Sequence, residues 1–124
     1  MSINIAVFIS GSGTNLQAII DACKTDKIDG QIKFVLSDKS DAYGLKRARK
    51  NNIKDIYLSK DEKQRDEKIL SYLDKYNIDL IVLAGYLSIV SPKIVKKYNK
   101  KIINIHPSLI PKYCGKGFYG KKIH

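Results

Sequence analysis

The sequence predicts an α/β fold built on a doubly wound, mainly parallel sheet. Short apolar runs rich in isoleucine, valine and leucine alternate with segments of helical periodicity along most of the chain. This alternation is typical of repeated strand–helix–strand units, whose strands run parallel. Right-handed crossovers then favour the strand order 3-2-1-4-5, with a crevice between the first and the fourth strand.

Five apolar runs mark the expected strands. Each run is short and rich in branched apolar residues, as is typical of strands buried on both faces of a sheet. The runs are residues 3–9, 32–36, 56–58, 80–84 and 102–105. After Ile105 the pattern stops, and prolines and glycines indicate an irregular tail without a closing helix.

Helical segments lie between these runs. Apolar residues recur at positions i, i+3, i+4 and i+7 in the first and third segments, and the second segment has a weaker stripe. The stripes are Leu16, Ile19, Ile20 and Cys23; Ala42, Leu45 and Ala48; and Ile69, Leu70, Leu73 and Tyr76. Ser91 as N-cap and Pro92 at the first helical position predict a fourth, short helix that ends near Tyr98.

Length and composition predict a single domain over residues 1–124. Of the 124 residues, 44% are apolar and 28% are charged, which excludes a disordered chain. No stretch approaches the roughly 18 apolar residues of a membrane helix, and the first residues lack the basic region of a signal peptide. Cys23 and Cys114 are too few for a disulfide framework or a zinc cage, so we expect a reduced, cytoplasmic protein without a metal.

The charge predicts small anionic partners. The net charge is +11, and only Arg47, Arg49 and Arg65 of the 23 basic residues are arginine. A basic balance favours phosphates, polycarboxylates or nucleic acid. Because the lysines are spread along the chain and aromatic residues are not interleaved with them, we expect no nucleic-acid or membrane partner.

A glycine-containing turn, residues 10–16, joins the first strand to the first helix. Glycines let backbone N–H groups approach an anion, and the helix N-terminus adds partial positive charge; Thr14 or Asn15 can cap the helix or bind a phosphate. The third glycine of the dinucleotide fingerprint is absent, which favours a single phosphate. Asp38, at the end of the second strand, leaves ribose binding open, and a tight turn without a ligand is the alternative.

Residues 83–90 leave the fourth strand as a largely apolar loop. A loop of this kind at the carboxyl end of a strand suits a flat heterocycle held by backbone hydrogen bonds. Core packing explains the same residues equally well.

The fifth strand carries Asn104 and, two residues later, His106. Their spacing places both side chains on one face of the strand and Ile105 on the other. An amide donor beside an imidazole can stabilise a developing oxyanion and move protons near neutral pH. All three motifs follow carboxyl ends of strands, so we expect them to converge at one edge of the sheet.

Together these motifs resemble the phosphoribosylglycinamide formyltransferases, the folate-dependent enzymes of purine synthesis. The matching segments are residues 9–19, 83–86, 104–111 and 112–120, so the resemblance covers nearly the whole chain. The Asn-x-His-Pro-Ser sequence is shared with other 10-formyltetrahydrofolate enzymes, whereas the opening glycine turn followed by Leu16 and Gln17 points to the glycinamide enzymes. The resemblance implies the Rossmann-like formyltransferase version of the doubly wound sheet.

The resemblance also implies a role for each motif in formyl transfer from 10-formyltetrahydrofolate to the amine of phosphoribosylglycinamide. The implied residues are Gly13, Thr14 and Asn15 for the substrate phosphate; Leu87, Ser88, Ile89, Val90 and Asn104 for the folate; and Asn104 and His106 for catalysis. The family often has an arginine where Ser88 stands. In the family an arginine ahead of the third helix also helps to bind folate, and its counterpart is sought among Lys60, Lys63 and Arg65.

The family continues beyond the last residue of this chain, with further strands, a final helix and a catalytic aspartate. We therefore expect the N-terminal portion of a formyltransferase domain, truncated at its C-terminus. Such a chain should be poorly active and should self-associate through an open sheet edge. Two alternatives stay open. One is another 10-formyltetrahydrofolate enzyme, such as methionyl-tRNA formyltransferase or a formyl-folate hydrolase, and the other is a nucleotide-binding fragment without catalysis.

Overall fold

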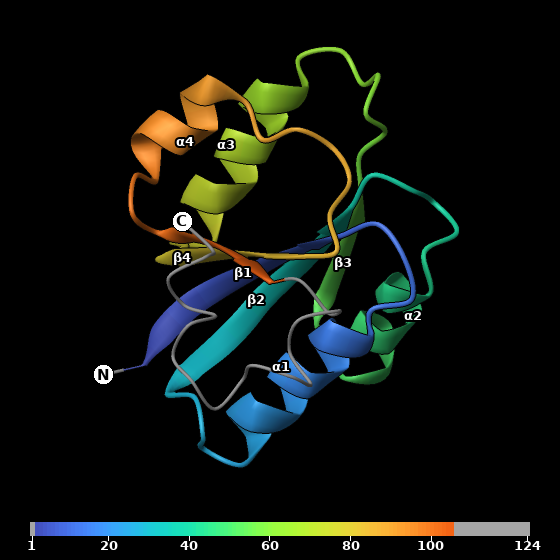
Figure 1. Ribbon diagram of the computed structural model, residues 1–124, viewed down its shortest axis with the longest axis vertical. Helices are drawn as coiled ribbons and strands as arrows, with labels where there is room; N and C mark the ends of the chain where they lie inside the picture. The colour runs from blue at the N-terminus through green and yellow to red at the C-terminus, as the bar shows by residue number, and fades with distance from the viewer. Residues whose placement is uncertain (1, 106–124) are drawn as a thin grey trace.

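The computed structural model describes residues 2–105, which form one five-stranded sheet with helices on both sides (Figure 1). The elements are β1 (Ile3–Ile9), α1 (Thr14–Lys24), β2 (Gly30–Ser37), α2 (Tyr43–Lys50), β3 (Lys54–Tyr57), α3 (Arg65–Lys75), β4 (Leu80–Ala84), α4 (Pro92–Lys97) and β5 (Ile102–Ile105). The strand order is β3-β2-β1-β4-β5, and every pairing is parallel. The predicted fold class and strand order are therefore confirmed.

The strand boundaries agree with the apolar runs for β1, β4 and β5 and differ for the other two. β2 is longer than its run, since it begins at Gly30 and ends at Ser37. β3 begins at Lys54, ahead of its run. It lies at the edge of the sheet and pairs with β2, so its backbone completes the ladder while the side chains of Lys54 and Tyr57 stay exposed. A continuous apolar run is expected only where both faces of a strand are covered, so it does not mark the exposed residues of an edge strand.

Helices α1 and α2 cover one face of the sheet, and α3 and α4 cover the other (Figure 1). Side chains of β1 alternate between these layers, as the pleat requires. Ile5, Val7 and Ile9 pack into the layer of α1 and α2, and Ala6 and Phe8 pack into the layer of α3 and α4. β1 is therefore the central element of both cores.

The predicted helical stripes are the faces that pack on the sheet. In α1, Leu16, Ile19 and Ile20 are buried, and partly buried Cys23 packs against the same cluster. The stripes of α2 and α3 are buried in the same way. None of the helices within residues 2–105 is long and apolar enough to span a membrane.

Helix α4 begins at the predicted cap. The Ser91 Oγ accepts a hydrogen bond from the Ile94 N–H at 3.4 Å, and Pro92 occupies the first turn. Ile94 is buried against the sheet. At the other end, the Tyr98 hydroxyl donates to the Ile78 carbonyl at 3.0 Å. Both ends of this short helix are thus fixed.

Replacing Ser91 tests the contribution of this cap. Ser91→Ala should lower the free energy of unfolding by about 1 kcal/mol, because the first helical N–H groups lose their side-chain acceptor. Ser91→Asp keeps an acceptor at the same place and should lose little. Urea unfolding of wild type and both variants measures the difference; equal stability of wild type and Ser91→Ala would show that the cap contributes nothing.

Candidate functional site

The turn between β1 and α1 is built on Gly13. This residue has a φ of 77° and is the N-cap of α1, which begins at Thr14 without a side-chain capping bond. Thr14 and Asn15 therefore do not cap the helix; they occupy its first turn. The N–H groups of a first turn have no acceptor within the helix, so these residues present backbone donors instead of a side-chain cap.

The turn lines a hollow of about 200 Å³, called here the turn hollow. Its lining residues are Gly11, Ser12, Gly13, Thr14, Asn15, Ala84 and Gly85. The first-turn N–H groups and the positive end of the α1 dipole favour an anion in such a place. The three residues predicted to hold a phosphate are thus brought together, and the end of β4 lines the same hollow.

Helix α2 contacts this turn through two residues that the sequence reasoning missed. The Gly44 N–H donates to the Gly11 carbonyl at 3.1 Å, and the Arg47 Nε donates to the Ser12 carbonyl at 2.7 Å. One signal could have drawn attention to Arg47, since arginine occurs only three times in a chain whose other basic residues are lysines.

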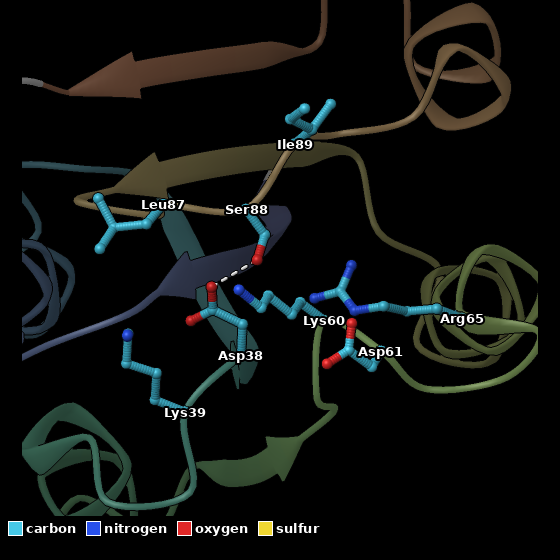
Figure 2. Close-up of a pocket in the computed structure, with 8 residues that line it drawn as sticks. All are labelled: Asp38, Lys39, Lys60, Asp61, Arg65, Leu87, Ser88 and Ile89. Carbon is cyan, nitrogen blue, oxygen red and sulfur yellow. Dashed lines mark hydrogen bonds between the residues drawn. The ribbon is translucent and has the colours of Figure 1, made fainter.

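A larger hollow of about 660 Å³, called here the loop hollow, opens beside the loop that follows β4 (Figure 2). Loops after β2, β3 and β4 and the start of α3 line it with Asp38, Lys39, Lys60, Asp61, Arg65, Leu87, Ser88 and Ile89. Leu87 and Ile89 are 74% and 86% exposed. Exposed apolar side chains beside charged groups are typical of a surface that a ligand covers.

Asp38 connects the loop after β2 to the loop after β4. The Ser88 Oγ donates to the Asp38 Oδ2 at 2.5 Å (Figure 2). The other carboxylate oxygen, Oδ1, is buried without a hydrogen-bond partner, which is costly unless a ligand supplies a donor. Asp38 lines the loop hollow and is not among the residues that line the turn hollow.

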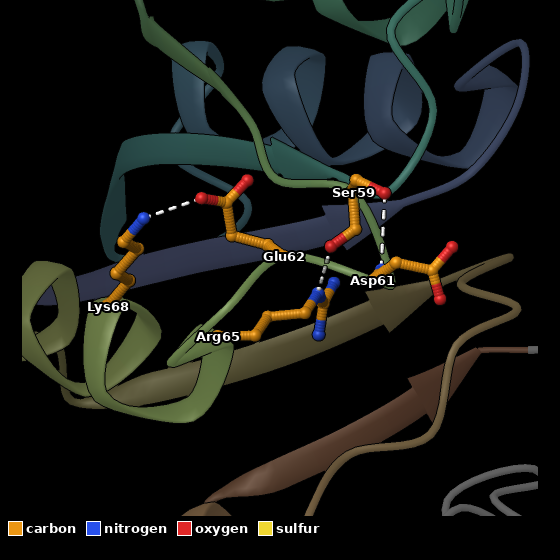
Figure 3. A network of polar contacts seen from close by, with 5 residues as sticks. All are labelled: Ser59, Asp61, Glu62, Arg65 and Lys68. Atoms are coloured by element: carbon orange, nitrogen blue, oxygen red, sulfur yellow. Dashed lines mark hydrogen bonds and ion pairs between the residues drawn. The ribbon is translucent and has the colours of Figure 1, made fainter.

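Arg65, the first residue of α3, projects into the loop hollow. Its Nε donates to the Ser59 carbonyl at 2.9 Å (Figure 3), and its Nη2 donates to the Tyr86 hydroxyl. Burial raises the pKa of the Tyr86 phenol, and the bond to Arg65 opposes that rise. The phenol is therefore neutral at pH 7. Of the three basic candidates, Lys60 and Arg65 line the hollow, and Lys63 is not among its lining residues.

Asn104 lines a third hollow, of about 390 Å³, between β5 and α4. Val90 lines this hollow as well, whereas Leu87, Ser88 and Ile89, the neighbouring predicted folate contacts, line the loop hollow. Ile105 packs into the opposite layer, with α1 and α2, as strand alternation predicts. His106, the second predicted catalytic residue, lies outside the described residues.

A partly buried hydrogen bond joins the turn after β1 to the loop after β4. Ser10 is only 4% exposed, and its Oγ accepts from the Leu87 N–H at 2.8 Å. The predicted convergence is therefore confirmed for the motifs that follow the first and the fourth strand. Residues 2–105 contain no group of three or more side chains that could hold a metal ion together.

Comparison with known proteins relates the chain to one enzyme family. Residues 3–123 match the family model described as formyl transferase. A protein of Haemophilus influenzae named phosphoribosylglycinamide formyltransferase is 49% identical over 123 residues, which are 96% of this chain and 58% of that protein. A protein of the same name from Escherichia coli is 49% identical over 90% of this chain and 55% of its own length.

Solved structures show the same relationship. The crystal structure of glycinamide ribonucleotide transformylase 1 from Symbiobacterium toebii is 40% identical, with a TM-score of 0.80, over 90% of this chain and 55% of that one. This chain thus spans little more than half the length of the relatives that it matches. The described residues superpose on the Rossmann-like fold of these proteins.

Substitution of Gly13 tests the backbone basis of the turn. Gly13→Ala should lower the free energy of unfolding by about 1–2 kcal/mol, because a positive φ disfavours a side chain and the new Cβ would lie 2.8 Å from the Gly44 Cα. Gly11→Ala is the matched control, since a Cβ there meets no atom within 4 Å. Urea unfolding compares the two; equal losses would contradict a special constraint at Gly13.

Proposed function

This chain belongs to the formyl transferase family, and we propose that it transfers a formyl group from 10-formyltetrahydrofolate to the primary amine of phosphoribosylglycinamide, a step of purine biosynthesis. The observation that carries the proposal is the placement of an anion-binding turn and an exposed apolar loop at one edge of the sheet, linked by the bond from the Leu87 N–H to the Ser10 Oγ. The relatives named for this reaction support the choice of substrates.

The turn hollow holds the phosphate of phosphoribosylglycinamide in this proposal. Gly13, Thr14 and Asn15 supply backbone donors from the first turn of α1, where the helix dipole favours negative charge. The phosphate lies away from the reacting amine, so its binding energy serves to orient the amine toward the formyl carbon. The net charge of +11 attracts the anionic substrates to the protein.

The loop hollow holds the folate. Leu87 and Ile89 bury their exposed side chains against the flat ring system, and Ser88 is fixed by Asp38. Arg65 and Lys60 provide positive charge for the carboxylates of the glutamate tail. Val90 and Asn104 contribute from the neighbouring hollow against β5. Ser88 brings no positive charge to the place where the family often has an arginine, so the positive charges that line this hollow are those of Lys39, Lys60 and Arg65.

The chemistry takes place at the carboxyl end of β5. The amine nitrogen bonds to the formyl carbon, and the carbonyl oxygen becomes an oxyanion. The Asn104 amide donates a hydrogen bond to this oxyanion, and the protonated His106 imidazole stabilises the same charge. Collapse of the intermediate breaks the bond from the formyl carbon to N10 of the folate; N10 gains a proton and the amine loses one.

The proposed partners are the two small-molecule substrates, without nucleic acid or a membrane. We place the reaction in the cytoplasm, in keeping with the free thiol of Cys23.

Variants of the two proposed catalytic residues test the function. Because the chain spans 58% of the Haemophilus relative, the assay uses residues 1–124 fused to the remaining C-terminal part of that protein. Asn104→Ala and His106→Ala should each lower kcat by roughly 10²-fold, the usual scale for losing an oxyanion donor, with little change in substrate KM.

Two outcomes of this assay would contradict the proposal. Near-wild-type turnover of His106→Ala would remove the catalytic assignment. Release of formate at the same rate with and without phosphoribosylglycinamide would identify a formyl-folate hydrolase instead of a transferase.

The proposed folate cation is tested with a matched pair of variants. Arg65→Met should weaken binding of 10-formyltetrahydrofolate by about tenfold, because a charged donor is lost from the hollow. Lys63→Met removes the same charge from a side chain outside the lining and should change affinity by less than about twofold. Titration calorimetry measures the Kd of each variant for 10-formyltetrahydrofolate. An equal change of Kd in the two variants would show that Arg65 is not part of the folate site.

A further inference from the structure

Helix α2 binds two successive carbonyl groups of the turn that leads into α1. The Gly11 carbonyl accepts from the Gly44 N–H at 3.1 Å, and the Ser12 carbonyl accepts from the Arg47 Nε at 2.7 Å. In a trans peptide the N–H points opposite to the C=O of the same unit. The N–H groups of Ser12 and Gly13 are therefore directed away from α2.

The Arg47 side chain that makes this contact is itself held on both sides. Its Nη1 donates to the Gln17 Oε1 of α1 at 3.4 Å. Its guanidinium carbon lies 5.0 Å from the centre of the Tyr43 ring, within the range of a cation–π interaction. The planar guanidinium thus spans α2, the turn and α1, an arrangement that a lysine ammonium does not reproduce.

We propose that Arg47 is a positioning residue for phosphate recognition: it holds the Ser12 carbonyl so that the Gly13 N–H stays directed at a phosphate monoester in the turn hollow. Arg47 acts through the backbone and does not touch the phosphate. The inference rests on the phosphate site proposed above and adds the residue that fixes its donors.

The same helix offers a matched control. Arg49 forms an exposed ion pair with Asp55 of β3, with a distance of 2.9 Å from Nε to Oδ2. Arg47→Met and Arg49→Met each remove one positive charge from α2, but only the first removes a contact with the turn. A change that merely lowers the positive charge of α2 would weaken phosphate binding in both variants, whereas loss of the contact with the turn affects Arg47→Met alone.

The experiment is a titration of the ¹⁵N-labelled chain with inorganic phosphate, followed through the amide signals of residues 13–15. Arg47→Met should raise the phosphate Kd by about tenfold or more, since a charge-assisted hydrogen bond that orients a donor is lost. Arg49→Met should stay within about twofold of wild type at physiological salt. Arg47→Lys keeps the charge and most of the stem, so it should fold and still bind phosphate more weakly than wild type.

A steady-state assay of the fusion protein separates positioning from general structural damage. Arg47→Lys should raise KM for phosphoribosylglycinamide while kcat and KM for 10-formyltetrahydrofolate stay near wild type. A fall in kcat with unchanged KM for phosphoribosylglycinamide would overturn the inference.

The two proposals fail in different ways. If phosphate does not shift the amide signals of residues 13–15 in wild type, the phosphate site is wrong, and the inference about Arg47 is wrong with it. Phosphate that binds wild type, Arg47→Met and Arg47→Lys equally well would overturn the inference alone.

Discussion

β1 lies between β2 and β4 with all strands parallel, and this constraint decides which loops can form a site. A parallel sheet sends every loop that follows a strand to the same edge. Because β1 and β4 are hydrogen-bonded neighbours, the glycine turn and the loop of residues 85–91 leave the sheet side by side. The bond from Leu87 to Ser10 then fixes one to the other. The closeness of the two proposed sites thus follows from strand order.

Backbone segments pack closely at the turn where we propose that a phosphate binds. A Cβ at Gly13 would lie 2.8 Å from the Gly44 Cα, and a Cβ at Gly44 would lie 2.1 Å from the Ile9 Cδ1. A side chain at Gly13 would meet the backbone of α2, whereas one at Gly44 would meet the end of the Ile9 side chain, so the backbone constraint lies at Gly13. The loop hollow is built differently, from long side chains such as Arg65 and from the contact of Asp38 with Ser88. The turn hollow is thus shaped mainly by backbone, and the loop hollow mainly by side chains.

The sequence was sufficient for the layers and strand order, because apolar runs and helical stripes report which faces are covered. It was insufficient for the bounds of β3, whose residues Lys54 and Tyr57 are exposed at the edge of the sheet. It gave no role to Arg47 and did not single out Arg65 among the three basic candidates, because their contacts with Ser12 and Tyr86 join residues 35 and 21 positions apart. Such contacts depend on how helices sit on the sheet, which local periodicity does not encode. The turn at Gly13 was found because its glycines impose a local backbone requirement.

We propose that the β1–α1 turn recognises the phosphate of an amine-bearing substrate. Calorimetric titration of the chain with phosphoribosylglycinamide and with its dephosphorylated form, ribosylglycinamide, tests this most directly, since the two ligands differ only in the group that the turn is proposed to bind. The account predicts measurable binding of the phosphorylated ligand and a loss of at least about tenfold in affinity without the phosphate. Equal affinity for the two ligands would contradict it.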